Sequence, residues 1–262
     1  MTNDELEKQR SYIVAKSNDF IQKSRFKLTL PEQKVIWYII SKVKYEDEEF
    51  KPFKFSISEY CRICNFEASS GGNYDMIRDA IKTLADKSMW IKTNPKTVSL
   101  MRWINEVDIT EGSGEIEVKL SDKMSPYLLQ LRENYTSLDL SVALAMKRKY
   151  SIRLYEILRC YVGLKEKKIK FKLDDFKEKM DINLDKKFSE LKKDIINPAI
   201  EEIDEYSDFY TTYALEKTGR KYTDIEFRFK NKTAWQYHQS INAVDKRLSN
   251  ISTKEDQISF VQ

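Results

Sequence analysis

"KFKLDDFKEKMDI", residues 170–182, repeats a pattern that occurs earlier in the chain, in "KFSISEYCRICNF" at residues 54–66. The two stretches match at an offset of 116, with lysine, aromatic and aliphatic residues at corresponding positions. Each copy opens with a short alternating run typical of a β-strand. A polar residue follows, Ser58 or Asp174, whose side-chain oxygen can accept from the free N–H groups at a helix start. Each copy therefore predicts a strand and then a short helix.

Two further matches extend the repeat on both sides. Residues 74–81 match 188–195 at an offset of 114, and residues 35–43 match 153–161 at an offset of 118. In the downstream pair the apolar positions recur at i, i+3 and i+7, as one face of a helix requires. One match could arise by chance, but three in the same order indicate a repeated unit of helix, strand, short helix and long helix.

Each unit is predicted to end in a β-hairpin. The first hairpin spans residues 96–120 with a turn at Glu111 to Gly114, and the second spans 209–230 with a turn near Thr218-Gly219. Apolar residues alternate in the last strand, as in a half-buried sheet. Three helices and a hairpin form a winged helix-turn-helix. The predicted fold class is α+β, with two tandem winged-helix (helix-turn-helix plus β-hairpin wing) domains related by an internal repeat.

The length of 262 residues suits two such domains. We expect an N-terminal segment at 1–24, a first winged-helix domain at 25–130, a second at 131–231, and a polar C-terminal tail at 232–262. The tail is weakly patterned, which predicts a helical or partly disordered segment.

Composition narrows the class of protein. Hydrophobic residues make up 41% of the chain and charged residues 34%, with a mean hydropathy of −0.62. We find no apolar run long enough to span a membrane and no apolar leader in "MTNDELEKQR", and the three cysteines fit a reducing compartment, so we expect a cytoplasmic protein. Residues 147–193 hold 16 Lys and Arg against 8 Asp and Glu. Such a field can attract nucleic acid or an anionic membrane, although a solvated lysine-rich surface is equally compatible.

Three segments together resemble a known family. They are "VAKSNDFIQKSRFKLTLPEQKVI" (14–36), "KRKYSIRLYEIL" (147–158) and "FSELKKDIINPAIEEI" (188–203). With the tandem winged helices, they are similar to plasmid replication initiators of the iteron-binding, Rep type-3 kind. The resemblance covers roughly residues 12 to 230.

The resemblance implies binding to double-stranded DNA at directly repeated sites, the iterons of a plasmid origin. It implies that monomers open the origin and recruit host replication proteins, a helicase and an initiator. It further implies a homodimer in equilibrium with the monomer, which represses its own gene. The first domain would carry dimerisation and weaker DNA contact, and the second would be the main DNA-binding domain. No catalysis and no cofactor are implied.

The long helix of the second unit is the predicted reading element. Its apolar face leaves Lys193 pointing outward, while Lys192 falls at the edge of the apolar stripe. Pro198 either kinks this helix or follows Asn197 as the first residue of a new one. Similar initiators usually carry arginine here, and lysine lacks the bidentate fork that reads guanine. The predicted DNA contacts of this region are Lys186, Lys187, Ser189, Glu190, Lys192 and Lys193.

A basic cluster opens the helix that begins near residue 149. A helical wheel places Leu154 and Ile157 on its buried side and points Arg153 and Glu156 away from it. Cations at a helix N-terminus oppose the helix dipole, which suggests a nearby anion. We therefore predict a phosphate clamp made of Lys147, Arg148, Lys149, Ser151 and Arg153.

The hairpins supply further candidates. The second hairpin carries basic residues around a glycine turn, which suits phosphate or minor-groove contact but also a plain solvated turn. Its predicted DNA contacts are Lys217, Arg220, Lys221 and Tyr222. The first unit is less basic, so weaker DNA contact or a protein-contact role is expected. Its candidates are Asn73, Tyr74, Arg78, Lys82, Lys96 and Arg102.

Other chemistries lack support in the sequence. Cys61 and Cys64 form a lone CxxC and His238 is the single histidine, so no metal site and no histidine-dependent nuclease are predicted. A phosphate-binding GxxxxGK[ST] loop is absent, and we predict no catalytic residues. The aromatic residues Trp37, Tyr38, Tyr155 and Tyr161 are expected in the core.

Two alternatives to an initiator remain at this point. A tandem winged-helix transcription regulator would bind a single inverted promoter site. A protein-interaction adaptor would use the same folds without DNA, because fold alone does not determine function.

Overall fold

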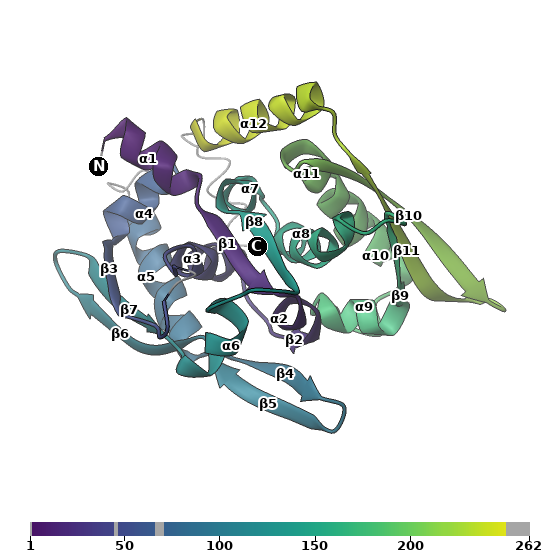
Figure 1. Ribbon diagram of the computed structural model, residues 1–262, viewed down its shortest axis with the longest axis horizontal. Coiled ribbons are helices and arrows are strands. Elements are labelled where there is room, and N and C mark those ends of the chain that lie inside the picture. Colours follow the sequence, from purple (N-terminus) through teal and green to yellow (C-terminus); the bar gives the residue numbers. More distant parts are fainter. Residues whose placement is uncertain (1, 45–46, 66–70, 250–262) are drawn as a thin grey trace.

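A computed structural model describes residues 2–44, 47–65 and 71–249. Two winged-helix units lie side by side and meet along a central layer of helices and one two-stranded sheet (Figure 1). We call the elements from α3 to β7 the first unit and those from α8 to β11 the second unit. The fold class predicted from the repeat is confirmed.

The first unit is built around a buried helix and a three-stranded sheet. Helix α3 begins at Leu30, and the preceding Thr29 forms a capping box with Glu32. The sheet has the order β3-β7-β6. The elements are α3 (Leu30–Ser41), β3 (Phe53–Ser56), α4 (Ile57–Ile63), α5 (Gly71–Asp86), β6 (Ile104–Thr110) and β7 (Glu115–Leu120).

The second unit repeats this plan. Its sheet has the order β9-β11-β10, so the strand before the short helix again pairs with the last strand. Phe55 pairs with Ile116 in the first sheet, and Phe171 pairs with Ile225 in the second. The elements are α8 (Lys149–Val162), β9 (Lys168–Lys172), α9 (Leu173–Lys179), α10 (Phe188–Leu191), the π-helical turn η2 (Lys192–Ile196), α11 (Asn197–Tyr206), β10 (Phe209–Thr218) and β11 (Lys221–Asn231).

An inserted hairpin corrects the prediction of one hairpin at 96–120. Strands β4 (Ser88–Asn94) and β5 (Thr97–Arg102) pair with each other, and β4 also pairs with β2 (Ser24–Arg25), in a separate sheet of order β2-β4-β5. The wing of the first unit is instead β6–β7, which has the predicted turn at Glu111 to Gly114. The second unit has no counterpart of β4–β5 among its described strands.

Segments near both ends of the described chain pack on elements far from them in sequence. Strand β1 (Ile13–Ser17) pairs along its whole length with β8 (Tyr135–Asp139). Helix α12 (Ala234–Ser249) packs on α7 and α11, so that part of the predicted tail is a docked helix. Residues 250–262 of that tail lie outside the described residues. The remaining elements are α1 (Asn3–Arg10), α2 (Asn18–Lys23), the 3-10 helix η1 (Asp122–Met124), α6 (Ser125–Leu128) and α7 (Leu140–Ala145).

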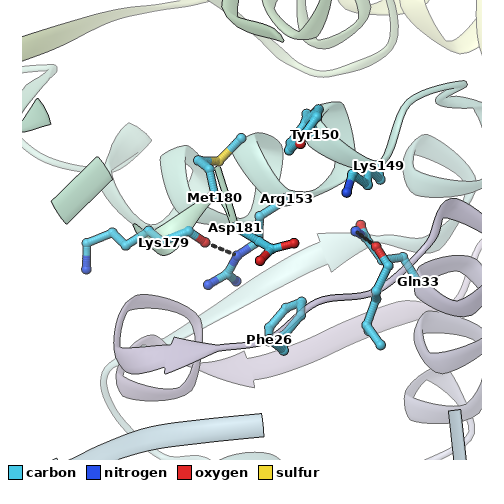
Figure 2. Close-up of a pocket in the computed structure, with 9 residues that line it drawn as sticks. Phe26, Gln33, Lys149, Tyr150, Arg153, Lys179, Met180 and Asp181 are labelled. Carbon is cyan, nitrogen blue, oxygen red and sulfur yellow. Dashed lines mark hydrogen bonds between the residues drawn. The ribbon is translucent and has the colours of Figure 1, made fainter. Parts of the chain in front are cut away.

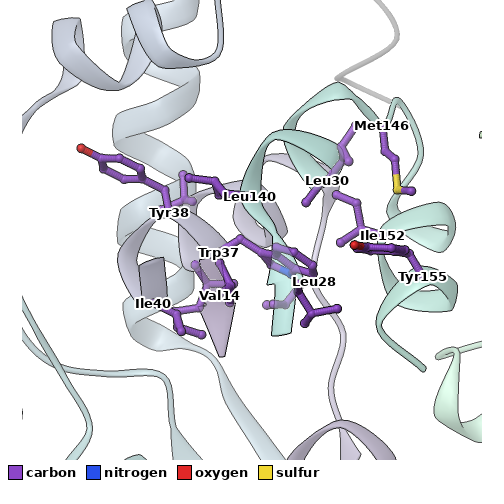
Figure 3. Packing of buried hydrophobic residues seen from close by; sticks show 14 of the residues in the cluster. Val14, Leu28, Leu30, Trp37, Tyr38, Ile40, Leu140, Met146, Ile152 and Tyr155 are labelled. Atoms are coloured by element: carbon purple, nitrogen blue, oxygen red, sulfur yellow. The ribbon is translucent and has the colours of Figure 1, made fainter. Parts of the chain in front are cut away.

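One apolar core runs through both units. Trp37 of the first unit packs on Tyr155 of the second, with ring centroids 6.2 Å apart (Figure 3). Both rings and Tyr38 are buried, and Tyr161 is partly buried. The prediction that these aromatic residues belong to the core is confirmed, and because the core is shared, the two units form one body.

Two helix starts differ from the predicted caps. Ser56, not Ser58, caps α4 by accepting from the N–H of Glu59. Helix α9 begins at Leu173, after Lys172, and has no side-chain cap, so Asp174 lies in its first turn. There the carboxylate favours the helix dipole instead of accepting a capping bond.

Candidate nucleic-acid interface

The candidate reading helix of the second unit is continuous from Phe188 to Tyr206 and contains a π-helical turn. Pro198 lacks an N–H, and the turn η2 lies immediately before it, where an α-helical bond would be missing. Residue Asn197 has helical dihedral angles, so it does not cap a new helix. The helix therefore continues through Pro198 with a π-helical turn before it, and the second predicted outcome, a new helix capped by Asn197, is wrong.

The outward face of this helix is rich in lysine. Leu191 and Ile195 are buried, whereas Lys192 and Lys193 are exposed. Within the described residues, no carboxylate forms an ion pair with Lys187, Lys192 or Lys193. These ammonium groups are therefore available to an external anion.

The start of the same segment is partly neutralised. Lys186 Nζ lies 3.2 Å from the Asp194 carboxylate and 3.8 Å from that of Glu190. Ser189 and Glu190 are exposed. Lys186 can thus hold the first turns of the helix together as well as contribute charge.

The predicted phosphate clamp is wrong in two of its members. Arg153 is 4% exposed and Ser151 is fully buried, so neither can reach a phosphate. A helical wheel describes α8 alone, but α2, β2 and the ring of Phe26, which precede the first unit, cover the helix at Arg153. Glu156, also predicted to point away, is buried as an ion-pair partner of Arg153 at 3.1 Å.

The remaining basic residues at the start of α8 have different partners. Arg148 lies 2.6 Å from Glu202 of α11, and the backbone N–H of Lys147 donates to the same carboxylate at 3.1 Å. Lys149 lies over the ring of Tyr150, with Nζ 4.8 Å from its centroid. Glu202 thus connects this segment to the reading helix, and among Lys147, Arg148 and Lys149 only Arg148 is strongly exposed.

The wing of the second unit is packed against the reading helix. All four predicted wing residues, Lys217, Arg220, Lys221 and Tyr222, are exposed around the turn at Gly219, which has a φ of 63°. The rings of Tyr222 and Phe188 have centroids 4.5 Å apart, and Lys217 Nζ lies 4.6 Å from the centroid of Tyr222. The aromatic pair joins the wing to the first residue of the helix, so their basic groups form one surface.

The first unit has an equivalent aromatic contact. Tyr74, which the repeat aligns with Phe188, lies under Gly114 in the turn of the β6–β7 wing. A side chain added at Gly114 would come within 2.8 Å of its ring. Sequence reasoning aligned Tyr74 with Phe188 but missed this wing contact, although aromatic residues at both positions were a usable signal.

The face of α5 carries less free charge. Arg78 lies 2.9 Å from Asp75 and 3.1 Å from Asp79, while Lys82 is exposed. Asn73 is 7% exposed, which places it in the core and not on the predicted surface. Lys96 and Arg102 are exposed, but they belong to the inserted β4–β5 hairpin and not to the wing. The candidates of the first unit are therefore spread over two separate structures.

Other chemistry has little structural basis in the described residues. Burial raises the pKa of the Cys61 thiol to about 12 and that of Cys64 to about 11, so both remain protonated core residues. The described part of the chain contains no group of three His, Cys, Asp or Glu residues placed to hold a metal ion. None of its helices is long and apolar enough to cross a membrane.

Comparisons with known proteins agree with this architecture. Residues 13–159 match the family described as "Initiator Replication protein, WH1", and residues 172–229 match "Initiator Rep protein, WH2". An uncharacterized 27.6 kDa protein of Escherichia coli is 21% identical over 223 residues, 79% of this chain and 92% of that protein. The PI protein of Escherichia coli is 27% identical over 157 residues, 53% of this chain and 50% of that protein. The crystal structure of a Pi initiator protein in complex with iteron DNA has a similar fold, with a TM-score of 0.68 at 18% identity. The similarity covers 85% of this chain and 98% of the Pi initiator chain.

Proposed function

The chain belongs to the replication initiator family whose two winged-helix domains it contains, and we propose that it binds directly repeated DNA sites, iterons, at a plasmid origin. The observation that carries the proposal is the continuous basic surface of the second unit. There Lys187, Lys192 and Lys193 are exposed without carboxylate partners among the described residues, next to the basic wing tip. A helix and wing of this charge suit a DNA major groove and its flanking phosphates.

The second unit is the main DNA-binding element in this proposal. Lys193 reads a base edge, while Lys192, Lys187 and the wing lysines contact phosphates. On the first unit, Arg78 shares its charge with two carboxylates, which weakens its attraction for DNA. Lys82 and Lys96 make the weaker contacts.

Footprinting across the encoding replicon tests this function. The initiator proposal expects protection of several directly repeated sites of roughly one to two helical turns each. Binding should weaken steeply with salt, with a log–log slope of about −0.9 for each phosphate neutralised. Protection confined to one inverted promoter site would instead favour a tandem winged-helix transcription regulator, and no protection at all would favour a protein-interaction adaptor.

We also propose that the inserted hairpin is the dimerisation surface. Trp90, Val98 and Leu100 are 53%, 57% and 47% exposed, and Trp90 is paired with Leu100 across the two strands. Strand β5 is the edge of its sheet, so its outer backbone groups can pair with another strand. An apolar face beside an open edge suits the same strand of a second copy, which joins two first units and leaves both reading helices free.

In the rest of the proposed function, the chain acts by binding DNA and proteins, without a catalytic step. Monomers on the iterons open the adjacent duplex and recruit a host helicase and initiator, and dimers repress the chain's own gene. The free basic surface supports the DNA steps of this scheme, and the exposed hairpin supports the dimer.

A further inference from the structure

Arg153 of α8 lies where the second unit meets α2 and β2, which precede the first unit, although its charge suggested a surface role. Its guanidinium donates to the carbonyl of Lys179 at 3.0 Å (Figure 2). It also donates to the carbonyls of Ile21 and Ser24, at 2.9 and 3.2 Å. The ring of Phe26 lies 4.6 Å from its central carbon. One side chain therefore binds the last residue of α9 and the end of α2 at once.

These acceptors belong to elements connected to the two reading helices, α10–α11 of the second unit and its counterpart α5 of the first. Helix α9 precedes α10 in the second unit. Ser24 begins β2, which pairs with β4, and β4 follows α5 in the first unit. Arg153 thus sits between the supports of α5 and of α10–α11.

Two more charges complete the junction. Glu156 accepts from Arg153 on one side and from Lys16 of β1 on the other. All three side chains are buried, and Lys16 also lies over the ring of Trp37 at 4.5 Å. We call Lys16, Glu156 and Arg153 the junction triad.

Burying a triad of charged side chains between packed elements has a cost in free energy. Removing charges from water is unfavourable, and an apolar contact of similar volume is often as stable. Hydrogen bonds are directional, however, and the planar guanidinium fixes the angle of each of its partners. The triad therefore restricts how the units can turn or slide against each other, which a purely apolar core would restrict less.

We propose that the junction triad sets the distance and rotation between the two DNA segments that α5 and α10–α11 contact, so that the chain selects sites by spacing. This inference rests on the proposed DNA binding by both units. Each base pair added between the segments moves one of them by about 3.4 Å and rotates it by about 35°. A rigid pair of reading helices cannot follow such a change without losing contacts on one side.

The unmodified chain provides the first test. A duplex is selected from a random library, the two protected segments are mapped by hydroxyl-radical footprinting, and one base pair is inserted or deleted between them. We expect both altered duplexes to bind on the order of tenfold more weakly than the selected one. Equal binding to all three, or a footprint with a single protected segment, overturns the spacing inference and leaves DNA binding intact. Failure to select any duplex overturns the proposed function itself.

Variants then assign the effect to the triad. Arg153→Lys keeps the charge but loses the fork, and we expect its spacing penalty to fall to about threefold or less. Arg159→Lys is the matched control. Arg159 is on the same helix, and its guanidinium binds Asp208 at 2.8 and 2.9 Å within the second unit. Its penalty should remain that of the unmodified chain. A folded Arg153→Lys chain with an unchanged penalty contradicts the inference, as does an equal loss in both variants.

If Arg153→Lys does not fold, Phe26→Leu replaces it. This change removes the ring beneath the guanidinium and keeps the hydrogen bonds. A partial reduction of the spacing penalty is expected, and an unchanged penalty contradicts the role of the triad.

Discussion

The first and second units share one topology and differ in what their surfaces offer. Both have the strand, short helix, long helix and wing in the same order, with an aromatic residue between helix and wing, Tyr74 or Phe188. The long helix of the first unit pairs Arg78 with two carboxylates, whereas that of the second exposes Lys192 and Lys193. The first unit alone carries the β4–β5 hairpin among the described strands.

This difference indicates a division of labour within a duplicated scaffold. The features that both units share are buried or hold the wing against the long helix. They give both units the same arrangement of helices and strands. The parts that differ lie on the surface, where a change of charge or an added hairpin does not disturb the core. DNA affinity is therefore expected to depend mainly on the second unit, and self-association on the first.

The largest expected effect is on DNA affinity. Lys192→Glu combined with Lys193→Glu should weaken binding by roughly 100-fold or more, because it removes two cations and places two anions beside the DNA. Lys82→Glu, on the equivalent helix of the first unit, should weaken it by about tenfold or less. Fluorescence anisotropy at one fixed salt concentration measures both, and similar losses from the two helices would show that the units contribute equally.

A smaller effect is expected on self-association. Leu100→Lys places a charge on the exposed hairpin and should weaken the dimer by about 2 kcal/mol, roughly 30-fold in Kd. The control is Leu164→Lys, since Leu164 is 44% exposed but lies in the second unit. Sedimentation equilibrium distinguishes them. Dimers that persist in Leu100→Lys, or dissociate equally in both variants, would rule out the hairpin.

The smallest effect, counted per pH unit, is on the free energy of unfolding and concerns the layer between the units. Burial lowers the pKa of Lys34 to about 7, and its ammonium donates to the carbonyl of Leu144 in α7 at 2.6 Å. In the unfolded chain a lysine stays protonated to about pH 10. Between these values the unfolded chain binds more protons, so the free energy of unfolding should rise with pH, by up to about 1.4 kcal/mol per unit.

Urea unfolding at pH 7, 8 and 9 measures this dependence. Lys34→Met should flatten it, while Lys51→Met, at an exposed position, should leave it unchanged. An identical slope in Lys34→Met and the unmodified chain would mean that Lys34 stays charged in the folded protein.

Local patterns predicted the elements of this fold well where each unit folds on its own residues. The repeat located both short helices, both long helices and both wing turns, because their apolar positions depend on neighbours within a few residues. The inserted hairpin was missed although Asn94-Pro95 between its strands is a local turn signal. Its pairing with β2, a strand more than 60 residues earlier, is shown by no local pattern.

For the candidate site, local patterns predicted the exposed residues but not the buried ones. Lys193 and the wing residues are exposed as expected, since they lie opposite a strong apolar stripe. Arg153 and Ser151 were misplaced because a helical wheel of α8 contains no information about the distant segments that pack on this helix. Buried charges of this kind become visible only when both units are in place.

The sequence preference of Lys193→Ala is the measurement that separates base reading from plain charge in the second unit. Binding is compared for a selected duplex and for every single-base-pair variant of it. We expect Lys193→Ala to lose discrimination at one position, by about 1–3 kcal/mol, and to keep it elsewhere. Lys82→Ala should lower affinity slightly for all duplexes alike. If Lys193→Ala instead weakens every duplex by the same factor, Lys193 contacts only phosphate, which contradicts base reading by the helix of the second unit.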